Sequence, residues 1–142
     1  MRYWDSAAII PLLVREPTSH AAREEHARDV EMVTWWGTPV ECVSALARLE
    51  REGSLAHSEL VVSFQRLDAL ASGWVEVQPS DRVRATAERL LRVHPLRAGD
   101  ALQLAAALAA ADEHPPSLRF VTRDARLALT AQREGFDVIQ PA

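Results

Sequence analysis

Short apolar runs alternate with longer amphipathic segments along most of the chain. The short runs are rich in aromatic and β-branched residues and predict strands, at Arg2–Trp4, Glu31–Trp35, Trp74–Val77, Leu118–Thr122 and Asp137–Ile139. The longer segments predict helices, at Ser6–Val14, Ser19–Asp29, Thr38–Glu52, His57–Ala71, Ser80–His94, Asp100–Ala111 and Ala125–Glu134. Strands that alternate with helices in this way are typical of an α/β sandwich with a mainly parallel sheet.

Two of the predicted helices have distinctive apolar faces. The His57–Ala71 helix has a one-sided stripe that suits packing against a core or a partner, formed by Leu60, Val61, Phe64, Leu67 and Leu70. The Asp100–Ala111 helix is apolar almost all round, which is typical of a helix covered on most sides. No linker or repeat interrupts the pattern, so we expect a single domain over residues 1–142.

Composition limits the classes of partner and mechanism. The formal charge of -4 and the isoelectric point near 5.7 argue against a surface that is basic all over, although a local basic rim for nucleic acid remains possible. All 16 basic residues are Arg. A mechanism that requires a lysine is therefore excluded.

The single cysteine and the hydropathy pattern indicate the compartment. Cys42 has no partner for an internal disulfide and is best interpreted as a buried small hydrophobe, which fits a reducing cytoplasm. The apolar stretch Ala7–Val14 is too short to span a bilayer and contains Pro11. We expect a cytoplasmic protein with no signal peptide and no membrane segment.

Four carboxylates lie where a predicted strand turns into a helix or where a helix begins: Asp5, Glu41, Asp100 and Asp124. In a parallel sheet these positions gather at one edge, so residues far apart in sequence meet there. Clustered carboxylates repel each other unless a cation is present, and oxygen ligands favour Mg²⁺ or Mn²⁺ over zinc. The five histidines are dispersed over unrelated segments and offer no competing metal set.

Each acid also has a purely structural interpretation. Glu41 is the third residue of a capping box that begins at Thr38, Asp5 and Asp124 could cap helices, and Asp100 could complement a helix dipole. Capping alone does not require an acid at every such position, because Ser, Thr or Asn serve equally well. The recurrence of acids at one kind of position therefore favours a shared function.

The chain resembles the PIN-domain ribonucleases, specifically the VapC-like toxins of bacterial toxin–antitoxin pairs. Four stretches carry the resemblance: Tyr3–Ala8, the helix opened by Glu41 with Ser44–Leu46, Leu96–Ala105, and Phe120–Leu127 followed by Gly135–Val138. The resemblance implies a three-layer α/β/α fold with a short parallel sheet. It also implies Mg²⁺- or Mn²⁺-dependent cleavage of RNA, a homodimer, and inhibition by a cognate antitoxin.

The same resemblance assigns the four acids as the catalytic and metal-binding set. Asp5 and Asp100 would bind the metal directly, and Glu41 and Asp124 directly or through water. Ser6 and Thr122 would support them by hydrogen bonding to a metal-bound water, although backbone capping is an equal alternative for both hydroxyls.

Two arginines lie close in sequence to two of the acids, and a pair of tryptophans also stands out. Arg97 and Arg123 are candidates for binding RNA phosphates, or are ordinary acid-paired surface residues. Trp35 and Trp36 stand where many relatives carry smaller residues; they could stack on a base, or contribute to the core or a dimer contact. A cationic arm of an antitoxin could enter the acidic pocket, with its helix along the stripe of Leu60, Phe64 and Leu67.

Three other functions fit less well or remain open. A signalling receiver domain needs a strand-end lysine, and a haloacid-dehalogenase-like phosphatase needs a second Asp where this chain has Ala7. A non-catalytic PIN-like module that binds RNA or protein is the main alternative. The complete set of acids argues against that module, because a degenerate site usually loses one.

Overall fold

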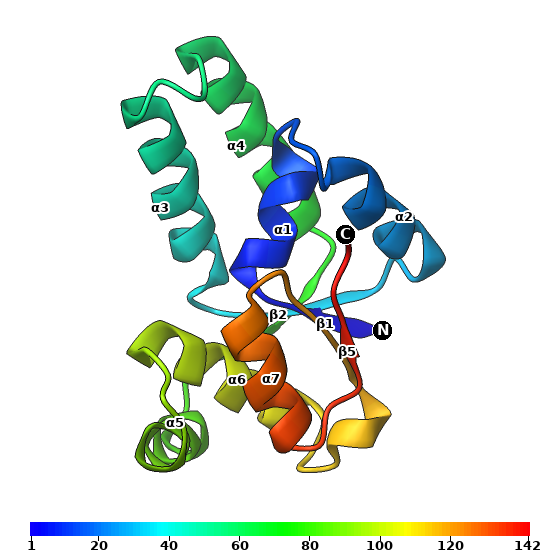
Figure 1. Cartoon of the computed structure of the whole chain (residues 1–142), viewed down its shortest axis with the longest axis vertical. Helices are drawn as coiled ribbons and strands as arrows, with labels where there is room; N and C mark the ends of the chain where they lie inside the picture. The colour runs from blue at the N-terminus through cyan, green and yellow to red at the C-terminus, as the bar shows by residue number, and fades with distance from the viewer.

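The computed structural model describes residues 1–142 and contains one sheet of five parallel strands (Figure 1). The strands are β1 (Arg2–Trp4), β2 (Met32–Trp35), β3 (Val75–Val77), β4 (Arg119–Val121) and β5 (Val138–Ile139). Their order across the sheet is β3-β2-β1-β4-β5. All five fall within the segments that the apolar pattern predicts.

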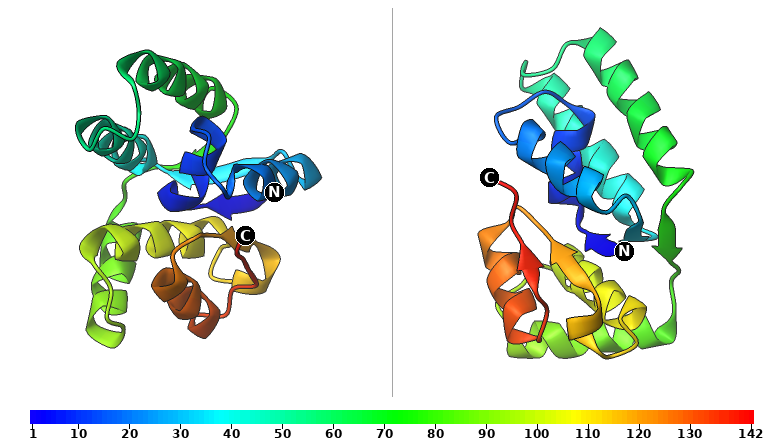
Figure 2. Two further views of the ribbon diagram at one scale, coloured as in Figure 1. Left: turned by 45° about the horizontal axis from the view of Figure 1, so that its top comes forward. Right: turned by 90° about the vertical axis from the view of Figure 1, so that its right-hand side faces the viewer.

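Helices cover both faces of the sheet (Figures 1 and 2). One face carries α1 (Ser6–Leu13), α2 (Ser19–Arg28), α3 (Thr38–Arg51) and α4 (His57–Ala71). The other carries α5 (Asp81–Val93), α6 (Ala98–Ala110) and α7 (Ala125–Arg133). The predicted three-layer α/β/α sandwich is therefore confirmed.

Alternating side chains of the strands pack into two separate hydrophobic cores, one on each face of the sheet. Tyr3 and Phe120 point into the core beneath α5, α6 and α7, and their rings stack with centroids 5.2 Å apart. Trp4 and Val121 point into the opposite core, with α1, α3 and α4. Because successive strand residues face opposite sides, a sheet buried on both faces needs apolar residues at consecutive positions, and this explains the continuous apolar runs.

The order of the strands creates a special position at the carboxyl ends of β1 and β4. The chain moves outward from β1 to β2 and β3, and then returns to lay β4 on the other side of β1. The helix that follows β1 lies on one face of the sheet, and the helix that follows β4 lies on the other. In open parallel sheets, ligands bind at the carboxyl ends of the strands beside such a reversal.

Local differences from the sequence prediction are small and have physical causes. The Pro115–Pro116 loop contains a 3₁₀ turn, Pro115–Ser117. Helix α6 begins at Ala98, two residues before Asp100, because Arg97 adopts the extended backbone of a helix cap. As expected, α6 is buried on most sides: Ala101 and residues 103 to 108 are all inaccessible or nearly so.

The prediction that the α4 stripe accommodates an antitoxin helix is wrong. Leu60 and Leu67 are only 6% and 4% exposed and pack in the core with α1 and α3, and Phe64 is partly buried against them. Ser63 and Arg66 also donate hydrogen bonds to the carbonyl of Leu13 at the end of α1. Burial of each leucine stabilises the fold by roughly 2 kcal/mol, so the stripe serves the chain's own core.

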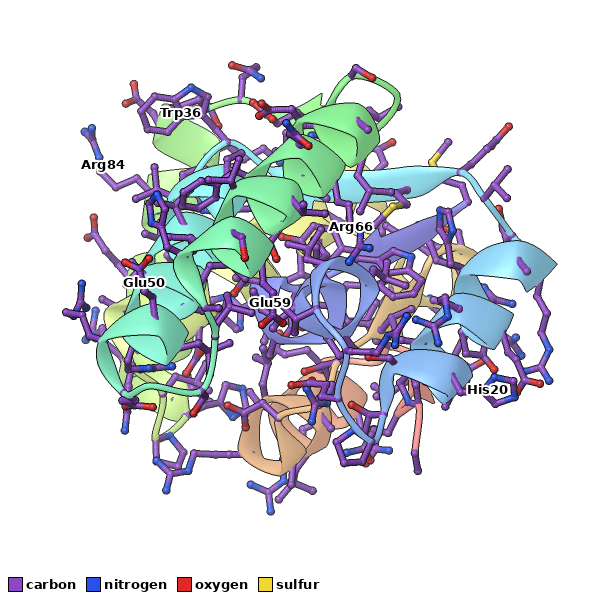
Figure 3. All side chains as sticks on the ribbon, turned by 90° about the horizontal axis from the view of Figure 1, so that it is seen from above. His20, Trp36, Glu50, Glu59, Arg66 and Arg84 are labelled. Atoms are coloured by element: carbon purple, nitrogen blue, oxygen red, sulfur yellow. The ribbon has the colours of Figure 1, made fainter.

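The two adjacent tryptophans have different environments. Trp35 is buried in the core beneath α5 and α6, whereas Trp36 is 54% exposed and lies at the periphery of the molecule (Figure 3). Their rings meet edge to face at 6.3 Å. None of the helices combines the length and the apolar character that crossing a membrane requires.

Candidate functional site

Asp5 follows β1 directly and is 3% exposed. Its Oδ1 accepts the backbone N–H of Ala8 at 2.8 Å, so Asp5 caps α1, as one of the two interpretations predicts. Its Oδ2 accepts the hydroxyl of Thr122 at 2.6 Å. Thr122 follows β4, so this bond joins the ends of the two strands at the point where the sheet order reverses.

Glu41 lies in the first turn of α3, but it does not form the predicted capping box. The helix is capped at Gly37 without a side-chain bond, and the Thr38 hydroxyl instead accepts the N–H of Trp35 at 3.1 Å. The Glu41 carboxylate is free to turn toward the sheet. Its Oε2 accepts the Ser6 hydroxyl at 2.9 Å, and its Oε1 accepts the Gln103 amide at 3.2 Å.

Asp124 and Asp100 lie at the starts of α7 and α6, two of the three helices on the other face. Asp124 caps α7, because its Oδ1 accepts the N–H groups of Arg126 and Leu127 at 2.9 and 3.0 Å. The N–H of Asp124 donates to Thr122 Oγ1 at 3.0 Å, which ties this residue to the Asp5–Thr122 pair. Asp100 lies in the first turn of α6 and is partly buried.

The four carboxylates lie within one electrostatic field. Burial raises the pKa of Asp5 to about 7; the bonds from Thr122 and Ala8 oppose this rise, and the Asp124 and Asp100 charges add to it. Burial also raises the pKa of Asp100, assisted by Asp124 and opposed by Arg97 and Arg126. The pKa of Glu41 rises through burial and the charge of Asp100, against the bonds from Ser6 and Gln103. The structure therefore brings all four predicted acids to the same edge of the sheet.

The negative charge of these acids also affects two neighbouring groups, Tyr3 and Cys42. Burial raises the pKa of the Tyr3 hydroxyl well above its ordinary value, and the charges of Asp5 and Glu41 raise it further. Burial raises the pKa of the Cys42 thiol to about 12, again with contributions from Glu41 and Asp5. Cys42 is buried as predicted and forms no disulfide.

The chemistry of these donors suits a hard divalent cation. The set offers carboxylate oxygens, which Mg²⁺ and Mn²⁺ prefer. In the conformation described, no three Asp, Glu, His or Cys side chains lie close enough together to hold one ion. The residues fit such an ion in chemical type and charge.

The basic residues near the acids differ from the predicted pair in one respect. Arg123 forms an ion pair with Glu16, so it is the ordinary acid-paired arginine that the sequence left as an alternative. Arg97 is exposed at the cap of α6 and close enough to lower the pKa of Asp100. Arg126, which the sequence analysis missed, is exposed in the first turn of α7 and has the same effect.

A cleft of about 570 Å³ begins beside Glu41 and Ser6 and runs between α1 and α3. Its walls combine apolar side chains, including Ile10 and Leu49, with polar ones. Arg48 and the Arg123–Glu16 pair contribute the other charges along it. Of the four acids, Glu41 alone lines this cleft, which is large enough for a ligand much larger than a metal ion.

Gln103 is the second residue that sequence reasoning missed. It is 1% exposed and contacts Tyr3, Thr38 and Glu41. A signal was present: Gln103 is the only polar residue between Asp100 and Ala111 in an otherwise apolar helix. A buried amide needs hydrogen-bond partners, so its occurrence in such a run indicates a polar cluster nearby.

Comparison with known proteins supports the fold. No protein-family model and no curated protein sequence matches the chain. Among solved structures, a toxin–antitoxin complex from Klebsiella pneumoniae aligns with a TM-score of 0.68 at 16% identity, over 100% of this chain and 98% of that one. FitAcB from Neisseria gonorrhoeae aligns with a TM-score of 0.68 at 20% identity, over 99% and 98%. At these identities the likeness establishes a shared fold over the whole chain.

Proposed function

We propose that this protein is a Mg²⁺- or Mn²⁺-dependent endoribonuclease that acts as the toxin of a toxin–antitoxin pair. The observation that carries the proposal is the convergence of four carboxylates from four separate segments at the reversal point of a parallel sheet. Three of them have raised pKa values, and each of those three feels the charge of another acid in the set. Such an arrangement destabilises the folded protein unless a cation binds there.

The four acids have distinct tasks in this proposal. Asp5 and Asp100 would hold the ion directly, and Glu41 and Asp124 would hold it directly or through water. Mg²⁺ or Mn²⁺, when bound, would supply an activated water and would neutralise the charge that develops on the scissile phosphate. Thr122 fixes Asp5, and Ser6 fixes Glu41, through the hydroxyl bonds described above.

RNA binding involves the basic residues around this edge. Arg97 and Arg126 flank Asp100 and are available for phosphate oxygens, which guanidinium groups bind in a bidentate manner. Arg123 is a weaker candidate because it already forms an ion pair with Glu16. The cleft between α1 and α3 accommodates the RNA next to the cleaved bond.

The proposed partners are a cognate antitoxin and a second copy of the chain, in the cytoplasm. One of the two structural neighbours is described as a toxin–antitoxin complex, and the acidic edge would attract a cationic antitoxin arm. Two exposed apolar side chains that do not line the cleft between α1 and α3, Trp36 just before α3 and Val43 on α3, support the homodimer. Analytical ultracentrifugation of Val43→Glu tests the dimer: a shift from dimer to monomer is expected, and an unchanged mass would contradict the use of Val43 in the interface.

Cleavage of labelled RNA by the purified protein tests the enzymatic function. We expect cleavage that requires added Mg²⁺ or Mn²⁺, and a loss of at least a hundredfold in rate for Asp100→Asn. Asp100 is the best position for this test, because it is the N-cap residue of no helix, and asparagine keeps a side-chain oxygen that can accept the backbone N–H of Arg97. Asp68→Asn on the exposed face of α4 makes the same chemical change away from the site and should retain full activity.

The alternative function, a PIN-like module that binds RNA or protein without cleavage, predicts a different result. In that case neither the unsubstituted protein nor either variant would cleave any RNA supplied with Mn²⁺. Equal cleavage by the unsubstituted protein and Asp100→Asn would instead indicate a contaminating nuclease. Either outcome would overturn the proposed function.

A further inference from the structure

Gln103 occupies the centre of a hydrogen-bond network that links three elements behind the acidic site. Its Oε1 accepts the hydroxyl of Tyr3 at 2.5 Å, from β1. Its Nε2 donates to Thr38 Oγ1 at 3.3 Å and to Glu41 Oε1 at 3.2 Å, both on α3. Gln103 itself lies on α6, on the opposite face of the sheet from α3.

Tyr3 determines which way the Gln103 amide points. The fully buried Tyr3 hydroxyl needs an acceptor, and the Gln103 carbonyl oxygen is the one that it contacts. With the oxygen held there, the NH₂ group must face Glu41 and Thr38. The reverse orientation would place an amide oxygen against the Glu41 carboxylate, and two acceptors repel each other.

This arrangement fixes the Glu41 side chain from two sides. Ser6 donates to Oε2 at 2.9 Å while Gln103 donates to Oε1. Each carboxylate oxygen has two acceptor positions, so one remains on each oxygen for a further partner. A long, flexible glutamate is thereby held in one orientation without losing its capacity to bind.

We infer that Gln103 is a positioning residue, which holds the Glu41 carboxylate in the orientation that it uses in the acidic site. The expected effect of Gln103 on catalysis rests on the proposed function. Its effect on the orientation of Glu41 does not. A residue that orients a metal-binding carboxylate typically affects metal affinity or activity ten- to a hundredfold. Tyr3 acts one step further back, because it orients Gln103.

Two variants separate these roles. Gln103→Met keeps the length of the side chain and removes its amide, and Tyr3→Phe keeps the ring stacked on Phe120 and removes only the hydroxyl. For Gln103→Met we expect a crystal structure in which the Glu41 side chain is reoriented or disordered, and about tenfold weaker Mn²⁺ binding in isothermal titration calorimetry. For Tyr3→Phe we expect a smaller loss of Mn²⁺ affinity, of about threefold.

Ser63→Ala is the matched control for a general loss of stability. Ser63 is 2% exposed, and its hydroxyl bonds to the backbone carbonyls of Leu13 and Glu59, at the end of α1 opposite to Asp5. It should lower the melting temperature without changing Mn²⁺ affinity. If Ser63→Ala and Gln103→Met weaken Mn²⁺ binding equally, the effect of Gln103 is structural and the inference is overturned.

RNA cleavage distinguishes this inference from the proposed function. For Gln103→Met we expect a lower kcat with the KM for RNA within twofold, because Glu41 orientation affects the reaction more than RNA binding. If the unsubstituted protein cleaves no RNA, the proposed function fails, and the crystal structure of Gln103→Met still tests the positioning role. An unchanged Glu41 conformation in that structure overturns the inference whatever the activity.

Discussion

Asp5 combines two requirements that usually fall on different residues. It caps α1 through Ala8, and it is an almost completely buried acid whose pKa burial raises to about 7. The first role stabilises the fold, with a cap being worth about 1 kcal/mol. The second opposes folding, because deprotonation leaves a buried charge near Asp124 and Asp100.

Asp5→Asn should therefore stabilise the protein at neutral and alkaline pH. The folded-state pKa of Asp5, about 7, lies above its ordinary value of 3.8. Between these values the folded protein binds more protons than the unfolded chain, so the free energy of unfolding falls as pH rises. Asparagine also caps helices and carries no charge, so we expect a gain of about 2 kcal/mol at pH 8.

Urea unfolding at pH 4 and pH 8 measures this change. The difference between Asp5→Asn and the unsubstituted protein should be small at pH 4 and largest at pH 8, and the variant should lose RNA cleavage at pH 8. Asp137→Asn, at an exposed ion pair with Arg119, is the control and should give no such gain. A variant less stable than the parent at pH 8 would contradict the interpretation.

The positions of the acids were predictable, whereas their hydrogen-bond partners were predictable only in part. Asp5 and Asp124 stand beside strand and helix signals that a sequence displays locally. Whether Glu41 caps its own helix or turns toward Ser6 and Gln103 depends on what packs above it. That choice involves residues up to 62 positions apart, which local patterns do not encode.

The helices illustrate the same distinction between local and long-range information. The bounds of α4 were predicted without error, because His57–Ala71 is set by a local apolar period and a Ser72–Gly73 stop. That pattern did not determine what the apolar stripe of α4 packs against. From the sequence alone, Leu60 and Leu67 could pack against either a core or a partner. In the folded protein they pack in the core with α1 and α3.

An ion pair ties the end of α7 to α5 and gives a prediction for this pair of helices. Arg89 on α5 donates a hydrogen bond to the carboxylate of Glu134, which follows α7, at 2.8 Å. His94, which follows α5, forms a second hydrogen bond with the same carboxylate at 2.7 Å. Burial raises the pKa of Glu134, but these two bonds and their charges outweigh it and hold the pKa below its ordinary value of 4.5. Such a carboxylate stabilises the fold above pH 4.5 and ceases to do so as pH falls through the lowered pKa.

Glu134→Gln should consequently destabilise the protein at pH 7 and have little effect at low pH. Because Arg89 is half exposed, solvent screens the pair and we expect a loss of ~1 kcal/mol or less at pH 7. Chemical denaturation at pH 7 and pH 3.5 measures it. Glu88→Gln, exposed on α5 without an ion pair, is the control; an equal loss at both pH values would mean that the charge of Glu134 contributes nothing.

For the whole molecule, the sheet order matters more than any single motif. The reversal between β1 and β4 brings together acids separated by more than 100 residues, and this is why Thr122 bonds to Asp5. The sequence predicted a parallel sheet, from which a common edge for the acids follows. It did not predict the strand order, because the apolar runs of β1, β2 and β4 are all buried and look alike.

Mn²⁺ binding should release protons and stabilise the whole protein. A metal ligand must be deprotonated, and near pH 7 Asp5 is about half protonated because burial and its acidic neighbours raise its pKa. Mn²⁺ affinity should therefore rise as pH increases from 5.5 to 8, by up to about tenfold per pH unit below pH 7. At a free concentration of 100 times its Kd, Mn²⁺ should add about 2.7 kcal/mol to the free energy of unfolding.

Titration calorimetry in two buffers with different ionisation enthalpies counts the protons released. Asp5→Asn is the decisive comparison, because it removes the group that carries the proton while retaining the helix cap. Its residual Mn²⁺ binding should release fewer protons and depend less on pH. If the unsubstituted protein binds Mn²⁺ with no proton release at pH 6.5, the ion binds elsewhere, and Asp5 is then a buried cap whose charge has another purpose.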